Sequence, residues 1–173
     1  QTEKGWRLQG DARIKDGKGQ AIAVPTFDLA GIAQGWQGNV RGLRVQDLWA
    51  WATPWLDETT RAGLVPLELR GELPEITFQA SPDAAGYTAN LRFKGLGWRP
   101  AQGLPGLDNL SGTLTVGPDH GRLDLESRRL RVDAEKALRE PVTVDTLTGA
   151  VNWRRSSSEL RLESQGLTLG NAD

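Results

Sequence analysis

The sequence predicts a mainly β protein, built as a long, curved antiparallel sheet with one short helical segment near residues 46–62. Three observations support this fold class. A strand-like stretch occurs twice near the C-terminus, apolar and polar residues alternate through most of the chain, and only one region has helical spacing. Alternation with period two gives each strand one dry and one wet face, which is typical of antiparallel sheets.

The repeat relates residues 110–133 to residues 147–170 at a constant offset of 37 residues. The identical positions are Leu110/Leu147, Gly112/Gly149, Leu123/Leu160, Leu125/Leu162, Glu126/Glu163, Ser127/Ser164 and Leu130/Leu167. A fixed period with conserved residue type indicates one structural unit used repeatedly. Each copy contains two alternating runs joined by a turn-forming segment, so each unit is predicted to be a meander that adds strands to a growing sheet. Residues 1–173 are therefore interpreted as a single segment of a repetitive β domain.

The apolar positions change parity within each copy. In the first copy they are odd-numbered at Leu123 and Leu125 and even-numbered from Leu130, so the change follows Ser127, and the reverse change follows Ser164. A β-bulge or corner at each place would return the apolar side chains to one face of the sheet.

The N-terminal third alternates more loosely. Strands are expected at residues 5–14, 20–30 and 40–45, and the turn-forming run 16–19 predicts a hairpin between the first two. Pro25 predicts an edge or a bulge in the second strand, because proline cannot donate to the ladder.

Residues 46–62 are predicted to form two short helices. Helical spacing places one apolar stripe on Leu48, Trp51, Ala52, Trp55 and Leu56. Pro54 forbids an unbroken helix, so the first helix should end near Ala52. Thr53 is then the expected N-cap of the second helix and Gly63 its expected C-cap.

Strands are expected to resume after the helices. Alternation and turn residues predict them at residues 64–70, 72–80, 86–94 and 142–146. The glycine-rich run 95–105, which contains Trp98, is predicted to be a loop.

Composition limits the possible partners. The 21 Lys and Arg residues balance 22 Asp and Glu residues, so the net charge of −1 gives no long-range attraction to nucleic acid or to an anionic membrane. The chain has no cysteine, which excludes disulfides and thiolate metal sites. It has no bilayer-spanning apolar run and no signal-peptide pattern after Gln1. We therefore expect a segment of a longer protein, with any anchor outside it.

Residues suited to catalysis are scarce. The single histidine, His120, lies in a turn and is expected to be solvated. Without a second histidine or a cysteine, the sequence has few residues that could form a catalytic nucleophile–base pair of the usual kind. No enzyme activity, cofactor or metal site is expected.

The charged residues of the repeats have simpler interpretations. Those that alternate with apolar residues predict cross-strand charge pairs on the wet face, and they are Arg122, Asp124, Glu126, Glu159, Arg161 and Glu163. The basic pairs Arg128-Arg129 and Arg154-Arg155 are expected to be solvated, with contact to a lipid headgroup or a partner as the alternative.

The apolar face leaves two structural interpretations open. Either it packs against the helices and the N-terminal strands, as in a sandwich, or part of it stays open as a groove for a ligand or a membrane. The groove hypothesis assigns the lining of the concave side to Leu114, Val116, Leu123, Leu125, Val151, Trp153, Leu160 and Leu162.

Several runs resemble the AsmA-like family and, within it, the YhdP branch of large envelope proteins of Gram-negative bacteria. These runs are residues 45–56, 67–71, 104–114, 140–153 and 162–173. The resemblance implies a taco-shaped β-groove with an apolar interior, in a periplasmic body that carries phospholipid towards the outer membrane. It also implies an inner-membrane anchor outside this segment, and as partners phospholipid and neighbouring segments of the same long chain. It offers no catalytic residues.

Two other functions remain open at this point. The chain could be a structural or assembly β-module of the cell envelope, with a closed core and protein partners bound at its sheet edges. A carbohydrate-acting enzyme would need two carboxylates converging in a cleft beside aromatic side chains, and the sequence shows no such pair.

Overall fold

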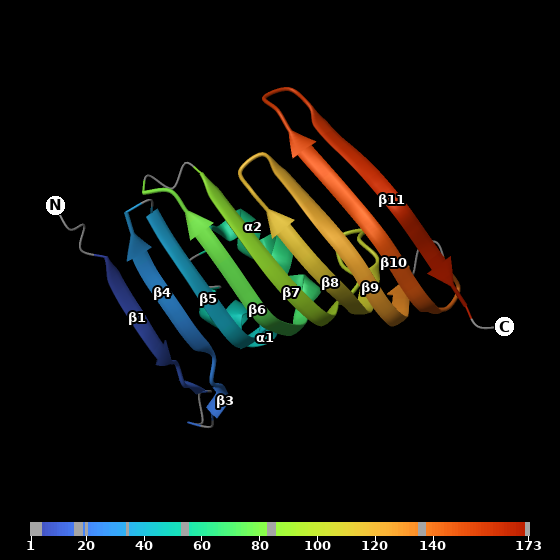
Figure 1. Ribbon diagram of the computed structural model, residues 1–173. Coiled ribbons are helices and arrows are strands. Elements are labelled where there is room, and N and C mark those ends of the chain that lie inside the picture. The colour runs from blue at the N-terminus through green and yellow to red at the C-terminus, as the bar shows by residue number, and fades with distance from the viewer. Residues whose placement is uncertain are drawn as a thin grey trace.

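The computed structural model describes residues 5–15, 19, 21–33, 35–52, 56–82, 86–134 and 138–171. In this part of the chain, nine strands form one open antiparallel sheet, and two short strands form a second, small sheet. Figure 1 shows the large sheet as a single layer with β1 at one edge and β11 at the other. The predicted fold class is confirmed.

Apart from β2 and β3, strands that follow one another in the chain are neighbours in the large sheet, so this sheet grows as a meander. In sheet order the strands are β1 (Trp6–Asp11), β4 (Thr26–Ile32), β5 (Gly35–Arg44), β6 (Arg70–Ala80), β7 (Tyr87–Trp98), β8 (Gly106–Val116), β9 (His120–Asp133), β10 (Val142–Arg155) and β11 (Leu160–Gly170). The small sheet pairs β2 (Ile14–Lys15) with β3 (Ala21–Ala23), while the predicted turn residues 16–18 lie outside the described residues.

The two ends of the strands differ. Short turns join β4 to β5, β6 to β7, β8 to β9 and β10 to β11 at one end, which we call the turn end. Longer segments join β5 to β6, β7 to β8 and β9 to β10 at the other end, which we call the connection end. The helices lie within the first of these longer segments and appear behind the strands in Figure 1.

The helical region is confirmed in outline and corrected in detail. Helix α1 (Val45–Ala52) ends where it was predicted to end, and residues 53–55 lie outside the described part. Helix α2 (Glu58–Leu64) has Asp57 as its N-cap, with the Thr60 N–H donating to Asp57 Oδ1 at 2.9 Å. The prediction of Gly63 as C-cap is wrong, because Gly63 lies inside α2.

The predicted strand at residues 64–70 is also wrong. Leu64 ends α2, and the chain continues as a 3-10 turn, η2 (Val65–Leu67), closed by the Glu68 N–H donating to the Val65 carbonyl at 3.2 Å. The apolar residues alternate here as they would in a strand, which led to the wrong prediction. Pro66, however, fits the first turn of a helix. Strand β6 begins only at Arg70, so the expected break at residues 71–74 is part of that strand.

A row of left-handed residues crosses five strands of the sheet. They are Gly42 (φ 74°) on β5, Gly95 (φ 60°) on β7, Asn109 (φ 68°) on β8, Arg129 (φ 52°) on β9 and Gly166 (φ 57°) on β11. Each is followed directly by a leucine. Arg129 and Gly166 are equivalent positions of the repeat.

The register of the ladder shifts beside Gly95, Arg129 and Gly166. Shifts occur between β6 and β7, between β7 and β8, between β8 and β9, and between β10 and β11. The bulges predicted after Ser127 and Ser164 are therefore confirmed. The prediction of a loop from residue 95 is corrected, because β7 continues through a bulge at Gly95 to Trp98.

Side chains replace the ladder bonds that the bulges interrupt. Ser127 is 1% exposed, and its Oγ accepts from the Ser111 N–H at 2.9 Å and donates to the Ser111 carbonyl at 3.1 Å. The Ser111 Oγ accepts from the Gly95 N–H at 3.0 Å. Buried backbone groups need such partners, so the row of bulges is held by specific hydrogen bonds.

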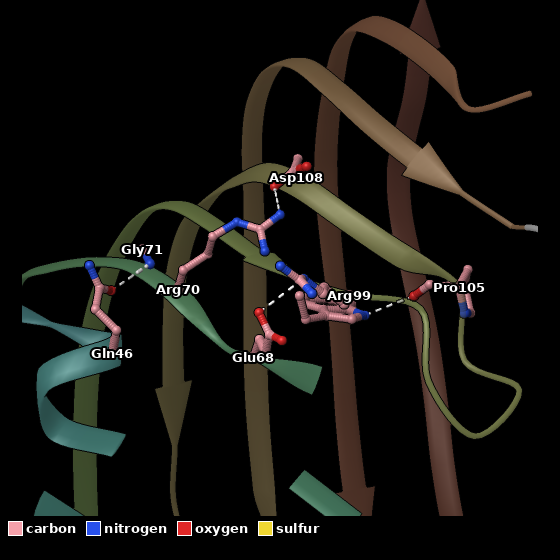
Figure 2. A network of polar contacts seen from close by, with 8 residues as sticks. Gln46, Glu68, Arg70, Gly71, Arg99, Pro105 and Asp108 are labelled. Carbon is pink, nitrogen blue, oxygen red and sulfur yellow. Dashed lines mark hydrogen bonds and ion pairs between the residues drawn. The ribbon is translucent and has the colours of Figure 1, made fainter. Parts of the chain in front are cut away.

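Polar contacts hold the connection end, where Figure 2 shows the strands curving beside the network. Arg70 reaches across β7 to form an ion pair with Asp108 on β8. Gly97 lies between them in register, and a Cβ atom there would stand 2.6 Å from Asp108 Oδ1. Arg99 Nε contacts Glu68 Oε2 at 2.9 Å, which ties β7 to the segment that precedes β6.

Only a thin core forms in the described part of the chain. The buried apolar residues there are Leu67, Leu73, Phe93, Leu130 and Ala150. Ser127 is the largest side chain that is fully buried. A single layer therefore supplies most of the structure, and a large part of its apolar surface is not covered by a second layer.

Candidate functional site

Two rows that are apolar except for Ser164 on the last strand cross all nine strands on one face of the sheet. Residues directly opposite each other in a ladder point to the same face, so the register traces each row. The first row is Leu8, Leu29, Gly38, Phe78, Ala89, Val116, Gly121, Trp153 and Leu162. The second row is Gly10, Phe27, Val40, Ile76, Leu91, Leu114, Leu123, Val151 and Ser164. We call this surface the apolar face.

The apolar face is long. Eight spacings of about 4.8 Å separate nine strands, so each row runs for roughly 38 Å across the sheet. Neither row contains a charged residue, and Ser164, on the last strand, is the one polar residue. The apolar face is therefore continuous in the direction perpendicular to the strands. We call its two rows together the track.

The structure brings all eight predicted groove residues to this face. Six belong to the two rows, namely Leu114, Val116, Leu123, Val151, Trp153 and Leu162. Leu125 lies two residues beyond Leu123 on the same strand, opposite Gly112, and Leu160 lies two residues before Leu162. Their role in binding lipid stays a prediction.

Glycines on the apolar face lie under large side chains of the next strand. A Cβ atom on Gly121 would stand 2.0 Å from the Trp153 ring, and one on Gly38 would stand 2.7 Å from the Phe78 ring. Gly31 has the same relation to Trp6, at 2.2 Å. Because each ring occupies the space above a glycine, the rings lie close to the backbone. The height of the apolar surface above the sheet is therefore similar from strand to strand.

The apolar face is open near the turn end and packed near the row of bulges. Trp36 is 56% exposed and Tyr87 is 42% exposed at the turn end, whereas Phe93 is 5% exposed. Trp6, Gly31, Trp36, Ala80 and Tyr87 form a further row in register at the turn end of the first five strands. We call Trp6, Trp36 and Tyr87 the aromatic rim.

Sequence reasoning missed the N-terminal half of this surface. The residues it left out include Leu8, Phe27, Leu29, Val40, Ile76, Phe78 and Leu91, together with the aromatic rim. Most of them carry the same alternation signal as the repeats. The register that aligns them with the C-terminal rows is a tertiary property, and no internal repeat marked it.

The opposite face is polar on every strand. One row across it is Gln9, Asp28, Asn39, Thr77, Asn90, Thr115, Arg122, Asn152 and Glu163. A shallow depression on this face is lined largely by neutral amides and hydroxyls, including Gln37, Asn39, Thr77, Gln79, Thr88 and Asn90. The sheet is thus amphipathic over its whole width.

Ion pairs on the polar face correct one prediction. Arg122 Nη2 contacts Asp124 Oδ1 at 2.6 Å, and Arg161 Nε contacts Glu163 Oε1 at 2.8 Å. Both pairs join residues two apart on one strand, so they are not cross-strand pairs as expected. Residues i and i+2 of a strand share a face, which permits this arrangement. Cross-strand pairs occur nearer the N-terminus, at Arg7–Asp28 and Arg41–Glu75.

The described residues contain no group of three His, Asp or Glu side chains able to hold a metal ion. His120 is exposed at the start of β9, as predicted, with Nδ1 2.8 Å from Asp119 Oδ1. Hydrogen bonds from Arg7 and then Gln9 lower the pKa of Asp28 to about 2, so this carboxylate is paired and ionised.

None of the helices in the described part of the chain has the length and apolar character needed to cross a bilayer. The family model for the YhdP protein matches residues 1–173, which is the whole chain. Comparison with curated proteins and with solved structures gave no match.

Proposed function

The chain belongs to the YhdP family of bacterial envelope proteins, and we propose that it is one segment of a periplasmic lipid conduit. Acyl chains of phospholipid lie against the apolar face, and the face supports transport of lipid between the inner and outer membranes. The observation that carries this proposal is the pair of apolar rows across all nine strands. We further propose that the chain has no catalytic role.

The cost of exposing acyl chains to water explains why lipid transport needs such a surface. A phospholipid has about 30 methylenes in its two chains, and exposing each to water costs about 0.8 kcal/mol, so roughly 24 kcal/mol opposes free diffusion. A surface that keeps the chains covered removes most of this barrier. Exposed apolar surface of this extent on one face of a sheet is typical of interaction sites.

The evenness of the track also supports movement along it. The rows contain no charged side chain, and rings such as Trp153 and Phe78 lie over glycines. A lipid that moves from one strand to the next therefore meets similar apolar surface at each step. Without deep energy minima, lipid could pass along the row under a concentration difference.

A charge placed in the track tests the proposal. The variant Val116→Asp puts a carboxylate between Ala89 and Gly121 in the first apolar row. Burying a carboxylate against acyl chains is costly, so we expect a loss of co-purifying phospholipid, measured by mass spectrometry of the gently purified chain. Trp153→Asp should act in the same way.

The matched control is Thr115→Asp. Thr115 is the neighbouring residue on β8 and lies on the polar face, opposite Asn90 and Arg122. This variant should keep the lipid content of the wild type, and far-UV circular dichroism should be the same for the wild type and all three variants. A wild-type chain that purifies without lipid, or a folded Val116→Asp chain that retains it, would refute the proposal.

A structural module with a closed core does not fit the described residues. That alternative requires the apolar residues to cover one another, but Trp6, Trp36 and Leu162 are 53%, 56% and 64% exposed. The carbohydrate-acting alternative likewise finds no support among the described residues. The carboxylates Asp28, Glu75 and Asp124 are each paired with an arginine on the polar face, away from the aromatic rim.

A further inference from the structure

The open part of the apolar face has a definite depth along the strands. On β7 it begins at Tyr87, which is 42% exposed, and ends at Phe93, which is 5% exposed. Six residues at about 3.4 Å each separate these positions, so the open part is roughly 20 Å deep. Leu130, on β9 at the row of bulges, is 4% exposed and marks the same limit.

This depth is close to the length of one acyl chain. The hydrocarbon core of a bilayer is about 30 Å thick and contains two leaflets, so the chains of one lipid fill about 15 Å. A chain that lies parallel to the strands would therefore fit between the aromatic rim and Phe93. Several lipids could then stand side by side along the rows.

The aromatic rim has the chemistry of a membrane interface. Trp and Tyr combine an apolar ring with a polar N–H or O–H, and they gather where acyl chains meet headgroups. Trp6, Trp36 and Tyr87 lie at the turn end and are all exposed. Arg155, the last residue of β10, is exposed at the same end and makes no ion pair within the described chain.

The connection end is less suited to headgroups. The segment with α1 and α2 and the run 99–105 occupy it. Several of its charges are engaged with one another, in the pairs Arg70–Asp108, Arg99–Glu68 and Arg44–Asp47 (Figure 2 shows the first two). A headgroup at these residues would have to compete with existing ion pairs.

Building on the proposed function, we infer that bound lipids have one orientation on the sheet. Their acyl chains lie parallel to the strands, with the methyl ends near Phe93 and Leu125 and the ester ends at the aromatic rim. The headgroups leave the protein at the turn end and stay in water.

Photocrosslinking at graded depths tests this orientation. The variants are Tyr87→p-benzoylphenylalanine at the aromatic rim, Leu91→p-benzoylphenylalanine at mid-depth and Leu125→p-benzoylphenylalanine at the deep end of the open part. Each is illuminated with vesicles of phosphatidylethanolamine and phosphatidylglycerol that carry palmitoyl and oleoyl chains. Tandem mass spectrometry locates the crosslinked carbon. Leu114, opposite Leu91 in the ladder, is the second mid-depth position if the Leu91 variant does not fold.

We expect the crosslinked carbon to move from near the ester at Tyr87 towards the methyl end at Leu125. The control is Asn90→p-benzoylphenylalanine, on the polar face of the same strand, which should give no lipid adduct. A reversed gradient, or the same carbons at every depth, overturns the orientation while leaving lipid binding intact. Folded variants without adducts at any depth overturn the proposed function as well.

Discussion

Individual side chains hold the first strand to the sheet. Arg7 donates to both carboxylate oxygens of Asp28, at 2.9 and 2.5 Å, and Gln9 donates to Asp28 Oδ2 at 2.9 Å. These contacts link β1 to β4, and β1 has no partner strand on its other side in the described chain. The group is exposed, so its effect should depend on pH and on salt.

The Asp28 cluster predicts a pH-dependent stability. Its hydrogen bonds from Arg7 and Gln9 lower the pKa of Asp28 from 3.8 to about 2 in the folded chain. Stabilisation is therefore present above about pH 4 and is lost as the pH falls towards about 2, because the unfolded carboxylate takes up its proton first. Asp28→Asn should lower the melting temperature near pH 7 and have no effect near pH 2.

An Arg7→Gln background supplies the control for this effect. With the main donor removed, Asp28→Asn should change the melting temperature near pH 7 by less than it does in the wild-type background. A difference between wild type and Asp28→Asn that is constant from about pH 7 to about pH 2 would show that the carboxylate does not stabilise β1.

At the scale of the elements, the bulges shape the sheet. Strands β5, β7, β8, β9 and β11 each carry a left-handed residue followed by leucine, and the ladder shifts beside β7, β9 and β11. A bulge bends a strand and increases its twist, so a row of bulges lets the whole sheet curve along one line. The thin core, with Phe93 and Leu130, lies along this line.

Ser127 is expected to be the critical hydrogen-bonding residue of the row of bulges. Ser127→Ala leaves the Ser111 N–H and carbonyl without their buried partner, which should lower the free energy of unfolding by about 1–3 kcal/mol. The repeat supplies the control, because Ser164 is the equivalent residue and is exposed. Ser164→Ala should change stability by less than about 0.5 kcal/mol. Equal effects in urea unfolding would contradict this role.

At the scale of the whole molecule, the sheet has two open edges in the described chain. The outer strand β11 is exposed along nearly its whole length, and its exposed leucines are Leu160, Leu162, Leu167 and Leu169. Unpaired N–H and carbonyl groups beside exposed leucines favour pairing with another edge. Charged neighbours such as Arg161 and Glu163 moderate this tendency without removing it.

The open edge predicts concentration-dependent self-association of the isolated chain. The double variant Leu162→Lys and Leu169→Lys should remain monomeric at concentrations where the wild type associates, as measured by light scattering after gel filtration. Leu104→Lys is the control, because Leu104 is 55% exposed but lies in the connection from β7 to β8. A wild-type chain that is monomeric throughout, or a control as effective as the β11 variant, would contradict edge pairing.

Local sequence determined the elements and the sides of the strands. Alternation of Leu123 and Leu125 with charged residues is enough to give each strand a dry face, because side chains on a strand alternate by geometry. The parity change after Ser127 was enough to predict a bulge. Local pattern failed at residues 64–70, where alternating apolar residues belong to a helix end and a 3-10 turn.

Only the tertiary structure decided that the apolar face is open and where it is open. Exposure depends on which layers lie over a strand, and alternation is the same whether a strand is covered or not. The contrast between exposed Tyr87 and buried Phe93, six residues apart on one strand, therefore came from the assembled sheet. The alignment of the aromatic rim likewise required the register of five strands, which no local pattern contains.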